Sequence, residues 1–87
     1  MNMDEAELAA RTARLPDTFA DRLPRDALRA LRIMADGGEW GEMLDLLLAV
    51  LSQAGTAVTA AERTELRQVL TGWRLPAAEV DDLPAQL

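Results

Sequence analysis

The chain has 87 residues, of which 49% are hydrophobic, and it carries a net charge of −6. This length and composition suit one small globular domain and argue against general disorder. The absence of cysteine, histidine and lysine excludes disulfides, thiol nucleophiles, imidazole chemistry and Schiff-base lysines.

The same features bear on where the chain works. A small domain without disulfides is expected in a reducing compartment. The first five residues, Met1 to Glu5, are acidic where a signal peptide is basic. The longest strongly apolar run, Met43 to Leu51, is about half the length that spans a bilayer. We therefore expect a cytoplasmic protein without a membrane partner.

In chain order, the first expected element is an amphipathic helix over residues 4–14. It should end at Leu15-Pro16, because the residue before a proline resists helical dihedral angles. Residues 17–23 are ambiguous, and Phe19 and Leu23 could pack there as one short turn. Pro24 then suits the first position of a second helix, which Gly37 and Gly38 end.

The third expected helix covers residues 39–54, and Gly55 closes it. Leucines line one face, and Met43 and further apolar residues widen that face almost around the helix. Such a helix is either central in a bundle or part of an intermolecular contact, and the bundle centre is favoured. Thr59 and Glu62 form a capping-box pattern that begins a fourth segment, which Gly72 ends.

These patterns predict an all-α fold in which residues 1–87 form a single helical domain. We expect a small bundle of three main helices, with less clearly defined helical segments at both ends. Residues 1–22 and 76–87 are expected to be the more loosely packed parts.

The residue inventory argues against an enzyme. A hydrolytic triad needs a histidine or a substitute base, and Ser52 is the only serine in the chain. No phosphate-binding loop is present. Paired carboxylates alone can hydrolyse glycosides, but so small a bundle rarely provides the cleft that they need. We expect no catalytic residues, no cofactor and no metal.

One charge pattern stands out. No cation occurs between Ile33 and Glu62, whereas Glu39, Glu42 and Asp45 follow one another at a spacing of three. These acids lie along one side of a helix, and the first two also favour its N-terminal dipole. They form either a solvated face or an anionic docking surface for a basic partner. Trp40 lies among them, as a core residue or as an interface anchor.

The segment from Arg11 to Arg32 is locally positive, with six arginines against three aspartates. Helix-surface pairs such as Arg22 with Asp26 and Asp26 with Arg29 would make it a partly paired, solvated face. It lacks the aromatic residues of a nucleic-acid site, and the net negative charge of the chain would repel nucleic acid. We therefore expect no nucleic-acid partner.

The run from Leu31 to Leu47 resembles a segment of small bacterial immunity proteins of the MafI-like kind. In that family a helix ends, a Gly-Glu-Trp follows, as Gly38-Glu39-Trp40 does here, and a leucine-rich helix leads to a short loop. The last helix then opens with Ser or Thr and acidic residues, as at Thr59. The loop in this chain, residues 55–58, lacks the acidic residues expected near it.

The resemblance implies a cognate partner, because such proteins bind and neutralise a toxin domain, often a nuclease, made by the same cell. We therefore expect an immunity protein that occludes a basic toxin domain, with Glu39, Trp40, Glu42 and Asp45 in the contact. The alternative is a helical interaction or oligomerisation module that uses the apolar helix around Met43–Leu51. Self-association stays open under both interpretations.

Overall fold

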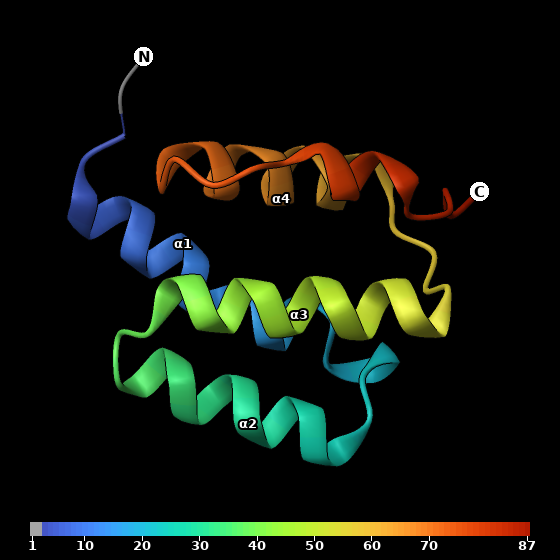
Figure 1. Ribbon diagram of the computed structural model, residues 1–87, viewed down its shortest axis with the longest axis horizontal. Coiled ribbons are helices and arrows are strands. Elements are labelled where there is room, and N and C mark those ends of the chain that lie inside the picture. The colour runs from blue at the N-terminus through green and yellow to red at the C-terminus, as the bar shows by residue number, and fades with distance from the viewer. Residues whose placement is uncertain (1–2) are drawn as a thin grey trace.

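The computed structural model describes residues 3–87 and is all-helical in this part (Figure 1). It contains four α-helices: α1 (Glu5–Thr18), α2 (Arg25–Asp36), α3 (Trp40–Ala54) and α4 (Ala60–Gly72). Two short 3₁₀ turns, η1 (Ala20–Arg22) and η2 (Ala78–Asp82), follow α1 and α4. The all-α fold is confirmed, but residues 3–87 contain four main helices rather than three.

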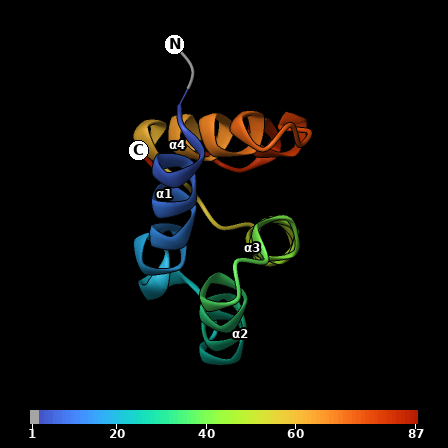
Figure 2. The same ribbon diagram turned by 90° about the vertical axis from the view of Figure 1, so that its left-hand side faces the viewer.

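The α3 helix lies in the middle of the molecule, between α2 and α4 (Figure 1). The α1 helix packs behind it and reaches from the level of α4 to that of α2 (Figure 2). It contacts all three other helices, whereas α2 packs on α3 and α1 and turns its remaining face outward. The apolar face of α3 is therefore covered, as its sequence predicts, whereas the side that carries Glu42 and Asp45 is exposed.

The additional helix comes from the N-terminal segment, where the predicted end at Leu15-Pro16 is wrong. The α1 helix continues through Pro16 to Thr18, and both Leu15 and Pro16 are buried. Pro16 lies in the last turn, so its missing N–H removes a single helical hydrogen bond. The Phe19 N–H closes the turn by donating to the Leu15 carbonyl at 3.2 Å.

The core is built from aliphatic side chains around one aromatic ring. Five of the buried residues come from α3: Met43, Leu44, Leu47, Leu48 and Leu51. Phe19 and Leu23, in the segment that the sequence leaves ambiguous, are also buried. The bundle closes around them.

Both ends of the chain supply core residues, although the sequence pattern favours loose packing there. Leu8 and Leu15 come from the N-terminal end, and Val80 and Leu83 from the C-terminal end. The tail is fixed beside the α3–α4 loop because the Val58 N–H donates to the Pro84 carbonyl at 2.8 Å. Arg63 of α4 adds hydrogen bonds to the Val80 and Leu83 carbonyls.

The helix boundaries that rest on capping chemistry are confirmed, except that Pro24 is the N-cap of α2 and not its first residue. Thr59 and Glu62 form the reciprocal capping box at the start of α4. Gly55, which closes α3, has φ +60°, and Gly38, after α2, has φ +69°; both lie in the left-handed region.

After α4, the left-handed position is held by Arg74 (φ 61°) instead of a glycine. The Leu75 N–H donates to the Leu70 carbonyl at 2.8 Å, the bond of a Schellman motif. We expect Arg74→Gly to raise the free energy of unfolding by about 0.5–1 kcal/mol, because glycine adopts this conformation without a Cβ penalty. Urea unfolding measures the change. Arg74→Ala is the matched control: it removes the same side chain but keeps the strain, so an equal gain in both variants would contradict this explanation.

Candidate partner-binding surface

The four residues predicted to contact a partner lie together at the start of α3. Glu39 is the N-cap of that helix and Trp40 its first residue. The α2–α3 turn fixes their position, since the Glu39 N–H donates to the Met34 carbonyl and the Met43 N–H donates to the Glu39 carbonyl, both at 2.9 Å. We call Glu39, Trp40, Glu42 and Asp45 the acidic surface. Its three carboxylate residues are exposed and Trp40 is half-buried.

Trp40 is held in place by contacts that cross the bundle. Its ring stacks on Trp73, with the centroids 6.2 Å apart and the planes 19° from parallel. The Trp73 Nε1–H donates to Thr12 Oγ1 at 2.9 Å, and that hydroxyl donates to the Leu8 carbonyl at 2.7 Å. One face of Trp40 is therefore anchored through α4 to α1. The sequence contains no signal for this stacking, because the two tryptophans lie on different helices.

The edge of Trp40 stays available. Within residues 3–87 no group accepts a hydrogen bond from its indole N–H, although every buried side-chain N or O atom in that part has a partner. The Trp40 N–H therefore reaches solvent. An aromatic side chain that is fixed on one face and open at its polar edge loses little conformational entropy on binding.

The carboxylates of the acidic surface have no cationic partner among the described residues, and the same holds for several other exposed acids, such as Asp36, Glu79 and Asp82. What distinguishes the acidic surface is that three such carboxylates lie together with a half-buried tryptophan. Elsewhere, four arginines on other parts of the bundle neutralise acids. These ion pairs are Arg11–Glu65, Arg22–Glu62, Arg22–Asp21, Arg32–Asp17 and Arg67–Asp81. Glu39, Glu42 and Asp45 take part in no ion pair within residues 3–87. Their charge is thus left to solvent or to a partner.

The Arg22–Glu62 pair shows that an arginine of the positive segment, Arg11 to Arg32, binds an acid on another helix. Two nitrogens of the Arg22 guanidinium donate to the Glu62 carboxylate, at 2.8 and 2.6 Å. These hydrogen bonds lower the pKa of Glu62 from 4.5 to about 2. The predicted pairs of Asp26 with Arg22 and Arg29 do not form within the described chain. Arg22 instead reaches across to the start of α4, which sequence spacing along one helix does not indicate.

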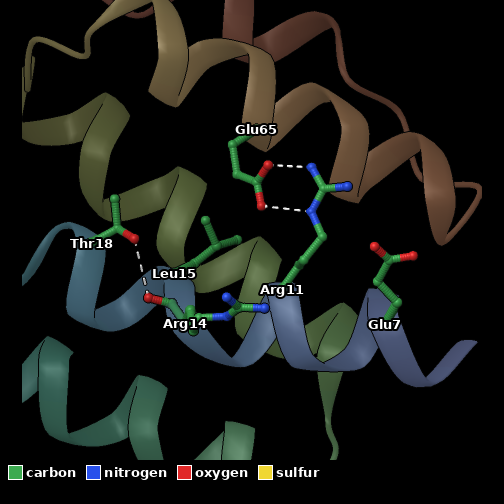
Figure 3. Close-up of a pocket in the computed structure, with 6 residues that line it drawn as sticks. All are labelled: Glu7, Arg11, Arg14, Leu15, Thr18 and Glu65. Carbon is green, nitrogen blue, oxygen red and sulfur yellow. Dashed lines mark hydrogen bonds and ion pairs between the residues drawn. The ribbon is translucent and has the colours of Figure 1, made fainter. Parts of the chain in front are cut away.

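A second pair joins α1 to α4 and lines a shallow pocket (Figure 3). Arg11 Nε donates to Glu65 Oε2 at 2.9 Å, a second guanidinium nitrogen contacts Oε1, and Gln68 accepts at 2.6 Å. The hydrogen bond from Arg11 holds the pKa of Glu65 below its usual value. Arg11 and Glu65 satisfy each other in this pocket, and Arg14 and Thr18 donate to backbone carbonyls of α1. The main feature of the pocket is therefore an ion pair that joins two helices.

The described residues contain no group of His, Cys, Asp or Glu side chains that could hold a metal ion. Within the same part of the chain, no helix is long and apolar enough to cross a membrane. Comparison with protein-family models, curated proteins and solved structures finds no match.

Proposed function

We propose that this chain is an immunity protein, which binds a cognate toxin domain one-to-one and neutralises it by occlusion. The partner would be a basic domain, such as a nuclease, whose cations meet the carboxylates of the acidic surface. The observation that carries the proposal is that Glu39, Glu42 and Asp45 lie together with Trp40, exposed and without an ion pair within residues 3–87. The resemblance of the Gly-Glu-Trp segment to MafI-like immunity proteins indicates that the partner is a toxin domain.

The acidic surface suits such a role in two ways. Its unpaired negative charges, on a chain of net charge −6, attract a basic domain and raise the association rate. Trp40, anchored on Trp73, offers an apolar contact with an available hydrogen-bond donor. Charged residues around a fixed aromatic anchor are a common composition of tight protein interfaces.

The alternative, an oligomerisation module that uses Met43–Leu51, receives less support. The five large side chains on the main apolar face of this segment are buried inside the bundle. They cannot also form a contact between molecules without unfolding the domain. Self-association would need another surface.

The test is co-expression of the tagged chain with the proteins encoded immediately upstream of its gene. We expect a one-to-one complex with a basic domain, and loss of that domain's toxicity. Recovery of the chain alone, as a defined oligomer without any partner, would favour the oligomerisation module.

Mutagenesis then locates the contact. The double charge reversal Glu42→Lys, Asp45→Lys should weaken the toxin complex by about 10–100-fold, mainly through slower association. The matched control is Glu79→Lys, Asp82→Lys, which changes the net charge equally at exposed positions of η2. Surface plasmon resonance of both variants compares the rates. Unchanged association of the first variant, or equal weakening by both, would exclude the acidic surface as the specific contact.

A further inference from the structure

We propose that the outward face of α2 binds the same face of a second copy of this chain, with the two helices antiparallel about a twofold axis next to Ile33. The face has six exposed residues: Arg25, Asp26, Arg29, Arg32, Ile33 and Asp36. This dimer does not rest on the proposed toxin partner, because none of these residues belongs to the acidic surface.

Ile33 is the apolar centre of this face. Its side chain is 61% exposed, and among the described residues the one other large apolar side chain so exposed is Leu87, at the chain end. A single exposed isoleucine is ordinary on a protein surface. Ile33, however, lies in a shallow depression along α2, whose lining also includes Leu28 and the aliphatic stems of arginines.

The charges on either side of Ile33 are opposite in sign. Arg29 precedes it by four residues and Asp36 follows it by three, so both lie on the same side of the helix about one turn away. With Ile33 facing Ile33 of the second copy, an antiparallel arrangement places each Arg29 opposite Asp36 of the other molecule. A parallel arrangement would place like charges opposite one another.

Arg29 and Asp36 are available to form these ion pairs between the two copies. Neither Arg29 nor Asp36 forms an ion pair with another residue of the described chain. Arg32, which lies next to the axis, is paired with Asp17 at 2.8 Å, so its charge is partly neutralised. Asp26, the one acid in the N-terminal half of α2, lies in its first turn, where the helix dipole favours it.

The size of the face limits the strength of the dimer. A helix of 12 residues is about 18 Å long at 1.5 Å per residue. One such face covers less than the roughly 800 Å² per partner of a standard stable interface. We therefore expect a reversible dimer with a dissociation constant on the order of 100 μM.

Sedimentation equilibrium of the purified chain over a concentration range of about 10 μM to 1 mM, which brackets that constant, tests this proposal. We expect a monomer–dimer equilibrium, and Ile33→Asp should weaken it by at least about tenfold, since it places two carboxylates at the axis. Thr64→Asp, at an exposed position of α4, is the matched control and should leave dimerisation unchanged.

A charge exchange tests the orientation of the helices. Arg29→Asp and Asp36→Arg should each weaken the dimer by about tenfold, because each replaces two opposite-charge contacts with like-charge ones. The double variant Arg29→Asp, Asp36→Arg restores both contacts with reversed polarity and should return to within about threefold of wild type. A monomer at all concentrations, a dimer insensitive to Ile33→Asp, or a double variant no tighter than the single ones would overturn the proposal.

Discussion

Phe19→Ala is expected to lower the free energy of unfolding by about 3–5 kcal/mol, the largest loss that we predict for a single substitution in this chain. Phe19 is fully buried at the junction between α1 and η1. Its ring also lies under the Arg22 guanidinium, 4.9 Å from the ring centroid, where a cation–π contact adds to the packing. Alanine would leave a cavity among aliphatic neighbours that cannot fill it.

The effect is large because a domain of 87 residues has a total stability of only roughly 4–13 kcal/mol. The melting temperature should fall by about 15 °C or more, as followed by far-ultraviolet circular dichroism. Phe19→Leu is the control, since it keeps most of the volume and should cost less than about 1.5 kcal/mol. Similar losses in both variants would mean that Phe19 contributes through the ring itself, by its shape or its contact with Arg22, and not through the buried volume.

Local chemistry explains which helix boundaries can be predicted. The capping box of Thr59 and Glu62 and the glycine after α3 act within a few residues of chain, so the sequence pattern contains the whole interaction. The rule that a helix ends before a proline fails at Pro16 because it takes no account of position in the helix. In the final turn of a helix a proline removes little hydrogen bonding, and burial of Leu15 favours the helical conformation.

The features that the sequence does not predict are contacts between distant segments. Phe19 and Leu23 are ambiguous in the sequence because their burial depends on where the other helices pack. Glu62 has no cation nearby on its N-terminal side in the sequence, yet its partner Arg22 lies 40 residues earlier in the chain. The acidic surface is predictable as an exposed cluster, because the missing cations and the helical spacing are local. The stacking of Trp40 on Trp73 is not.

Glu62→Gln is expected to destabilise the fold by about 2 kcal/mol at pH 7, the second largest effect. Glutamine can still fill the N3 position of the capping box, so the substitution removes mainly the charge that faces Arg22. The partly buried guanidinium then keeps its desolvation cost and loses its closer carboxylate partner, so that only the 3.4 Å contact with the exposed Asp21 remains. Chemical denaturation of the two proteins side by side measures the difference.

The pH dependence identifies the cause of that difference. The pKa of Glu62 is lowered in the folded state, to about 2 from the ordinary value of 4.5. Its charge therefore contributes stability that is fully present above pH 4.5 and is lost as the pH falls towards 2. The gap in unfolding free energy between wild type and Glu62→Gln should accordingly shrink over this window. Glu65, whose pKa is also lowered by an arginine, titrates in both proteins and cancels in the comparison.

Arg22→Gln provides the reciprocal variant, because it removes the same ion pair from the other side. In the Arg22→Gln background, Glu62→Gln should cost much less than about 2 kcal/mol, and the cost should depend on pH much more weakly, because only the hydrogen bonds with Thr59 then lower the pKa of Glu62. A cost that stays constant from neutral pH down through that window in the wild-type background would show that glutamine perturbs the capping box instead. A cost that shrinks with pH mainly when Arg22 is present would assign the stabilisation to the contact between η1 and the start of α4, which ties the first half of the chain to the second.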